Sequence, residues 1–238
     1  MSDTMFQNID LGQIIITLTP LLIGVTVHEL AHGWVAWKMG DPTAKAAGRL
    51  SLNPLRHLDL FGSLILPLVL KLSGSPILFG YAKPVPVNFA NLRPYRKGIL
   101  WVSAAGVIAN LILAVISALG FKLCLMLAPL WYDSFFRPMM MAILAMIGYS
   151  VVINCVLAVF NLIPIPPLDG SRIVSLLIPP SFQLYYYRLE RFGIIIVIGL
   201  MMTGVLSHII SVPLNPLLTL LLGDDGIRLM FGTTGVLK

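Results

Sequence analysis

Two histidines and a glutamate lie close together in the stretch Thr26 to Trp34, which reads Thr-Val-His-Glu-Leu-Ala-His-Gly-Trp. His28 and His32 are four residues apart, so on a helix they project from one face. Two imidazoles at this spacing can bind one zinc ion, and the intervening Glu29 is then placed to take a proton from an attacking water. The alternative is a helix with two incidental histidines and a glutamate paired to a neighbour.

The motif follows an uncharged apolar stretch over residues 11–27. The whole chain of 238 residues is 58% hydrophobic and only 11% charged, with a mean hydropathy of +0.91. This composition is typical of an integral membrane protein and excludes a soluble domain. The helix that carries the motif is therefore predicted to span a membrane. Ionisable groups within a membrane span are costly and are functional candidates by default.

Four apolar segments are long enough to cross a bilayer as helices. They are expected at about residues 11–39, 98–121, 138–163 and 192–212. Shorter apolar pieces at 60–72 and 214–222 are too short to cross alone, and the first is expected to enter the membrane and return. We predict an all-α polytopic membrane protein with about four full transmembrane helices. One membrane-embedded domain, which contains the proposed metal site, is expected over residues 1–222 and a short polar tail over 223–238.

Residues 78–87 read Leu-Phe-Gly-Tyr-Ala-Lys-Pro-Val-Pro-Val. The β-branched and aromatic residues suit an extended edge segment, and the prolines exclude a helix or a central strand. We predict a small membrane-associated β-segment here, whose edge pairs with the extended backbone of a substrate. The residues expected in this pairing are Gly80, Tyr81, Pro84, Val85 and Val87.

A catalytic zinc usually takes three protein ligands, so the two histidines need a third. His57 lies in a polar loop after the first span, and His208 is expected near the opposite face of the membrane. Asp169 follows a proline-rich break at the end of the third span, on the same side as the end of the first, and precedes Gly170. We favour Asp169, and its alternative role is to cap the following helix.

Other polar and small residues in the spans each have two interpretations. Asn161, near the end of the third span, would either donate a hydrogen bond to an oxyanion or tie down the broken helix. In the second span, the small residues at 103–106 would let another helix approach closely, and Asn110 would hydrogen-bond across the bundle. Helix packing alone explains that patch equally well.

The basic residues are distributed unevenly over the connections. Twelve Lys and Arg lie in the connections after the first and third spans, against four in the connection after the second span and in the tail. The positive-inside rule places the first two connections in the cytoplasm and the active site nearer the cytoplasmic face. The net charge of +6 is therefore explained by membrane topology, and we expect no nucleic-acid partner.

Taken together, four motifs resemble those of the site-2 protease family of intramembrane zinc metalloproteases (peptidase family M50), in the compact prokaryotic form without a PDZ domain. In chain order they are His28–Gly33, Leu52–Gly62, Gly80–Asn88 and Asn161–Gly170. The resemblance implies one Zn²⁺ per chain on His28, His32 and Asp169, with Glu29 as the catalytic base. It also implies a multi-pass protein of a prokaryotic inner membrane.

The resemblance further implies hydrolysis of peptide bonds in or near transmembrane segments, so the expected partners are a membrane-spanning protein substrate and the lipid bilayer. The chain departs from the family at Val107 and at Leu60, where proline is frequent, and neither position is an expected ligand. A zinc transporter is a competing reading, but it needs a second polar site along its pathway. An inactive relative is another, and the presence of Glu29 argues against it.

Overall fold

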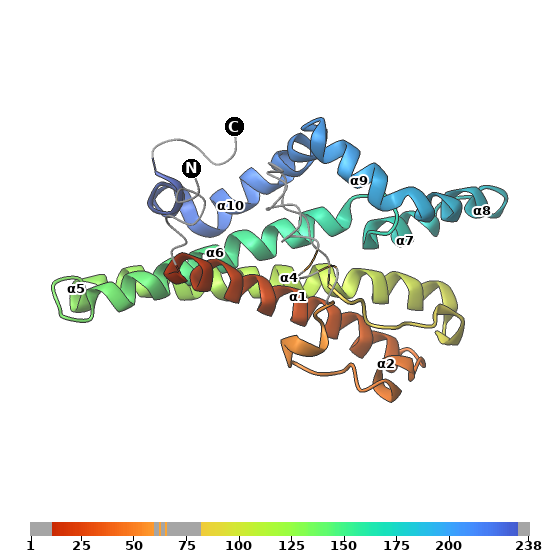
Figure 1. Ribbon diagram of the computed structural model, residues 1–238, viewed down its shortest axis with the longest axis horizontal. Coiled ribbons are helices and arrows are strands. Elements are labelled where there is room, and N and C mark those ends of the chain that lie inside the picture. The colour runs from red at the N-terminus through yellow and green to blue at the C-terminus, as the bar shows by residue number, and fades with distance from the viewer. Residues whose placement is uncertain (1–10, 60–61, 63–64, 66–81, 233–238) are drawn as a thin grey trace, which may run out of the picture.

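Four long apolar helices dominate the computed structural model, which describes residues 11–59, 62, 65 and 82–232 (Figure 1). Within those residues, the helices long and apolar enough to cross a membrane are α1 (Leu11–Lys38), α4 (Tyr95–Met126), α6 (Arg137–Leu162) and α10 (Val205–Phe231). The shorter α-helices are α2 (Thr43–Ala46), α5 (Ala128–Trp131), α7 (Asp169–Ser175), α8 (Pro180–Arg188) and α9 (Gly193–Met202). Single 3-10 turns are η1 (Pro54–Arg56), η3 (Phe89–Asn91) and η4 (Leu189–Phe192). The predicted all-α polytopic membrane fold is confirmed.

Helix α4 is central to the bundle. It packs along α1 and α6, which also contact each other, and α10 lies against α6 and α4. The largest apolar core lies between α4, α6 and α10 and includes the fully buried Phe121, Leu214 and Leu218. On the outward face of α4, by contrast, Ile112 and Leu119 are more than half exposed. An apolar exterior suits a bilayer, because lipid offers no hydrogen bonds to polar side chains.

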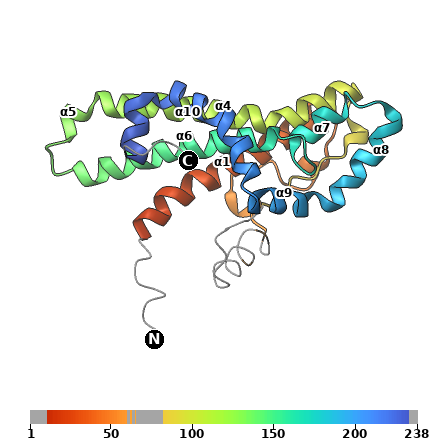
Figure 2. The same ribbon diagram turned by 90° about the horizontal axis from the view of Figure 1, so that it is seen from above.

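The two ends of the bundle carry different connections (Figures 1 and 2). The turn between α4 and α6, which contains α5, lies at one end of the long axis. Helix α2, which follows α1, lies towards the other end with α7 and α8, which follow α6. Helix α2, at the start of the connection after the first span, and the helices after the third span therefore lie towards the same end of the molecule, as the charge distribution predicts.

The fourth span differs from the prediction. The apolar stretch expected to cross at 192–212 is divided at Gly204, whose φ of 73° ends α9, and the fourth long helix is α10. Pro213 and Pro216 were expected to interrupt the chain, but both lie inside α10. Leu214 and Leu218, four residues apart, bury one face of this helix in the core, so packing outweighs the local cost of the prolines. The backbone of Gly223 is not helical (φ 73°, ψ 168°), so α10 is kinked at the residue where the polar tail was expected to begin, and further helical turns follow the kink up to Phe231.

The predicted β-segment forms no strand where the structure describes it. Residues 82–88 run without regular secondary structure, because their N–H groups donate to other partners and prolines remove two of them. Gly80 and Tyr81 lie outside the described residues, as does nearly all of the apolar piece at 60–72 that was expected to re-enter the membrane.

Candidate metal centre

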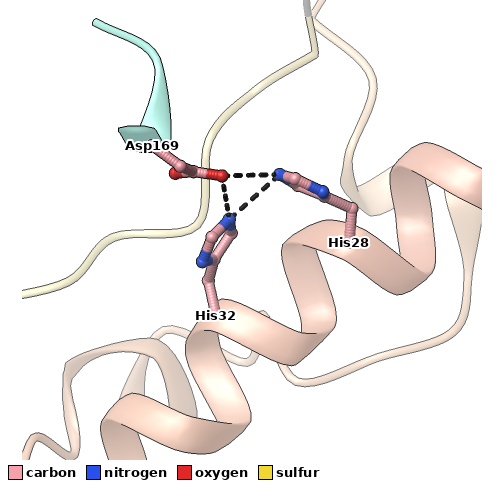
Figure 3. Close-up of side chains that lie close together, drawn as sticks. All are labelled: His28, His32 and Asp169. Atoms are coloured by element: carbon pink, nitrogen blue, oxygen red, sulfur yellow. Dashed lines mark hydrogen bonds and ion pairs between the residues drawn. The ribbon is translucent and has the colours of Figure 1, made fainter. Parts of the chain in front are cut away.

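His28 and His32 project from the same face of α1 into the bundle. Both side chains are buried, with exposed fractions of 7% and 9%. Their Nε2 atoms lie 3.0 Å apart, and the rings meet edge to face with centroids separated by 4.6 Å. One turn of helix thus brings two nitrogen ligands to one point (Figure 3).

Asp169 completes this cluster from a different part of the chain. Its Oδ2 atom lies 3.2 Å from His28 Nε2 and 3.1 Å from His32 Nε2 (Figure 3). It is the first residue of α7, and the N-cap position belongs to Leu168, which makes no side-chain cap. The alternative role of Asp169 as a helix cap is therefore not seen. The irregular chain before it packs tightly, because a Cβ on Gly170 would collide with the Leu162 carbonyl.

The second nitrogen of each histidine is held by helix α4. His28 Nδ1 lies 2.6 Å from Asn110 Oδ1, and His32 Nδ1 donates to the Val102 carbonyl across 2.6 Å. A Cβ on Gly106 would overlap both imidazole rings, so α4 can approach this closely only with glycine there. From the sequence, Gly106 was expected to allow close helix packing and Asn110 to hydrogen-bond across the bundle. The structure shows that both residues contact the histidines directly.

Glu29 lies beside the cluster at the edge of a cavity of about 340 Å³. Its Oε2 accepts a hydrogen bond from the Val85 N–H across 2.7 Å. The two histidines, Asp169 and Asn161 also line this cavity. The carboxylate therefore faces the same space as the three clustered ligand atoms, as proton transfer there requires.

The extended segment over residues 82–88 forms one wall of the cavity, through Pro84, Val85 and Val87. Its Lys83 N–H donates to the His57 carbonyl across 2.9 Å. Further along, the Asn88 N–H donates to Asp41 Oδ2 across 2.7 Å. These contacts and the one to Glu29 hold the segment against α1 and the loop that follows it.

Asp41 is the fully buried anchor of this segment. Burial raises the pKa of its carboxyl group, but hydrogen bonds donated by Thr43, Asn91 and Asn88 outweigh burial and hold the pKa below its usual value. The carboxylate stays ionised and keeps its acceptor capacity for the backbone of the segment.

His57 and Asn161, the other residues weighed from the sequence, are both placed. His57 is buried and its Nε2 lies 2.8 Å from the Ser51 carbonyl, so it is not part of the cluster. Asn161 lines the cavity while its Nδ2 donates to the Leu157 carbonyl one turn earlier. That hydrogen bond stabilises the end of α6, and the Asn161 Oδ1 remains available to accept hydrogen bonds from other groups. From the sequence, Ser103 was expected only to be a small packing residue. In the structure Ser103 also lines the cavity, and its buried Oγ has no hydrogen-bond partner among the described residues.

The three ligand atoms suit a zinc ion. Among the described residues, the cluster of His, Cys, Asp or Glu able to hold a metal consists of His28, His32 and Asp169, with all ligand atoms within 4.8 Å of one another. Asp169 Oδ2 is buried and receives no hydrogen bond there. Two nitrogens and one carboxylate oxygen from three residues are the donor set of a catalytic zinc site.

Comparisons with known proteins agree with this donor set. The family model described as peptidase family M50 matches residues 132–204. YwhC of Bacillus subtilis, named as an inferred zinc metalloprotease, is 38% identical over 89% of this chain and 88% of its own. Rip2 of Mycolicibacterium smegmatis, named in the same way, is 31% identical over 83% of this chain and 70% of its own. No solved structure gives a significant match.

Proposed function

The chain belongs to peptidase family M50 and is a zinc metalloprotease of the membrane, and from this premise we propose that it is an intramembrane endopeptidase. Its substrates would be membrane-spanning proteins, cleaved in or near their transmembrane segments. Zinc would be bound once per chain by His28, His32 and Asp169, with Glu29 as the base. We assign no role in nucleic-acid binding.

The observation that carries this proposal is the position of the cluster on a membrane-spanning helix. His32 lies six residues before the end of α1 at Lys38, which corresponds to roughly 9 Å along the helix axis. The ligands are buried between α1, α4 and the start of α7 rather than in a soluble domain. A peptide bond must therefore come to this depth to be hydrolysed.

The chemistry follows from the residues around the cavity. Zinc, when bound, makes a water molecule more acidic and polarises a carbonyl group. Glu29 acts as the base and takes a proton from the attacking water. Its Oε1 is the atom that would accept this proton, because Oε1 has no partner among the described residues, whereas Oε2 accepts a hydrogen bond from the Val85 N–H. As the peptide C–N bond breaks, Glu29 returns the proton to the leaving nitrogen. The substrate must be locally extended, because helical carbonyls are already hydrogen-bonded.

A second cavity of about 410 Å³ adjoins the cluster and supports an apolar substrate. It shares His28, Glu29 and Asn161 with the first cavity. Its remaining walls are mostly apolar and come from α1, α6, α9, the segment before α7 and the extended segment over residues 82–88. They include Val25, Leu157, Phe160, Leu168, Ile194 and Val197. Apolar side chains that flank the scissile bond of a membrane segment would bury their surface there.

The proposal is tested by comparing membrane proteomes of cells that carry the wild-type chain or the Glu29→Gln variant. Cells with the variant should accumulate uncut membrane-spanning proteins, and cells with the wild type should contain fragments that end within membrane segments. Fragments that end only in soluble loops would reject cleavage within membrane segments, and identical proteomes would reject the activity.

We also propose that the active site lies nearer the cytoplasmic face of a prokaryotic inner membrane. The twelve-to-four distribution of Lys and Arg supports this orientation. A cysteine placed at Lys45, in α2, should resist an impermeant thiol reagent in sealed cells and react after the membrane is opened. A cysteine at Asp133, in the turn between α4 and α6, should react in sealed cells. The reverse pattern would invert the orientation.

A further inference from the structure

Two buried asparagines connect His28 to main-chain carbonyl groups. Asn110 Nδ2 donates to the Gly24 carbonyl across 3.1 Å and to Asn154 Oδ1 across 2.8 Å. Asn154 Nδ2 in turn donates to the Ser150 carbonyl across 2.8 Å. Both asparagine side chains are essentially inaccessible, with exposed fractions of 0% and 1%. The contacts join α1, α4 and α6 at the depth of the cluster.

The Ser150 carbonyl determines how the side-chain amides of Asn154 and Asn110 are oriented. A main-chain carbonyl only accepts hydrogen bonds, so Asn154 must turn its Nδ2 towards Ser150 and its Oδ1 towards Asn110. Asn110 must then present Nδ2 to Asn154, and the Gly24 carbonyl independently requires the same orientation. The oxygen of Asn110 is left to face His28.

His28 consequently has one permitted tautomer. Asn110 Oδ1, 2.6 Å from His28 Nδ1, can only accept, so Nδ1 carries a proton, and in the neutral imidazole Nε2 therefore keeps its lone pair. That lone pair points towards Asp169 Oδ2, 3.2 Å away. His32 reaches the same state by a different route, because the Val102 carbonyl accepts from its Nδ1. Both imidazoles are thus prepared to bind a metal through Nε2.

We propose that Asn110 is a positioning residue for the zinc site, and that Asn154 sets its orientation. This role rests on the proposed function of His28 as a zinc ligand. An outer partner of this kind fixes the tautomer and the ring orientation of a metal-binding histidine, and its loss typically weakens metal binding by about 10- to 100-fold. Gly24 belongs to the same arrangement, because a Cβ there would lie 2.9 Å from Asn154 Oδ1.

The test uses the full chain, labelled with ¹⁵N-histidine, in detergent and stripped of metal by a chelator. Nitrogen NMR at a pH where the imidazoles are neutral reports which ring nitrogen carries the proton. In the wild type, both His28 and His32 should be protonated at Nδ1. In Asn110→Leu, His28 should populate the Nε2-protonated form, while His32 should keep its proton on Nδ1, because the Val102 carbonyl is untouched.

Zinc affinity, measured by competition with a chelator, should fall by about 10- to 100-fold in Asn110→Leu. Asn215→Leu is the matched control, since it makes the same change in α10, outside the cluster, and should alter neither the NMR signals nor the affinity. If Asn110→Leu does not fold, Asn110→Ala replaces it; water that enters there both donates and accepts, so it no longer selects one tautomer of His28.

The proposal is overturned if His28 stays protonated at Nδ1 in the folded Asn110 variant, or if zinc affinity falls no further than in Asn215→Leu. Neither measurement uses a substrate. Failure of this inference is therefore distinct from failure of the proposed proteolysis, which would appear as an inactive wild type with normal zinc binding.

Discussion

Replacing Glu29 with Gln should lower the rate of hydrolysis of a membrane-spanning substrate by about 10²- to 10⁴-fold while the chain keeps its zinc. The two side chains have nearly the same shape, but the amide does not accept a proton from water. The Val85 N–H donates to Glu29 Oε2 across 2.7 Å, and the amide oxygen of glutamine accepts the same hydrogen bond. The substitution thus removes the base without releasing the extended segment.

The measurement is the initial rate of product formation with purified chain and substrate in lipid vesicles, together with elemental analysis of zinc. Glu190→Gln makes the same change at a partly exposed ion pair with Arg172, whose atoms are 3.4 Å apart. Such pairs contribute little, so this control should cleave at the wild-type rate. Equal rates for the Glu29 and Glu190 variants would refute hydrolysis by this motif. Loss of zinc from the Glu29 variant would give its carboxylate a role in metal binding instead.

The first three spans were predictable because each is a long and uniformly apolar segment. The observed helices α1, α4 and α6 cover those segments. The shared face of His28 and His32 follows from helical periodicity alone. The convergence of Asp169 on this face also followed from the sequence, since the charge distribution puts the ends of the first and third spans on one side of the membrane.

The hydrogen-bond partners of His28 Nδ1 and His32 Nδ1 could not be predicted from the sequence. They depend on where α4 crosses α1, and Asn110 lies 82 residues from His28 along the chain. The signal available was Gly106 followed by Asn110 one turn later, but the same pattern suits two helices that merely pack. Only the three-dimensional contact separates the two readings.

The predicted bounds of the fourth span were wrong for a related reason. Proline is a strong local signal for the end of a helix, and Pro213 and Pro216 were interpreted in that sense. The structure keeps the helix through both, because Leu214 and Leu218 are fully buried against α4 and α6. A short stretch of sequence does not show which residues will be buried in the bundle. The rule that proline ends a helix therefore led to the wrong bounds for the fourth span.

Replacing Asp169 with Asn should weaken zinc binding as well as proteolysis, in contrast to the change at Glu29. The amide keeps the size of the side chain but has no negative charge, and it is a poorer ligand for Zn²⁺ than a carboxylate. A direct ligand contributes more than an outer partner, so we expect zinc affinity to fall by more than about 100-fold. His28→Ala should produce a loss of the same kind.

Chelator competition gives the affinity, and thermal unfolding with and without zinc gives an independent readout. A ligand that binds only the folded chain raises its stability in proportion to the logarithm of concentration over Kd. The zinc-dependent rise in Tm should therefore shrink in Asp169→Asn and persist in Asp225→Asn, which makes the same change at an exposed position in α10. If Asp169→Asn keeps both zinc and rate, the third ligand is another residue.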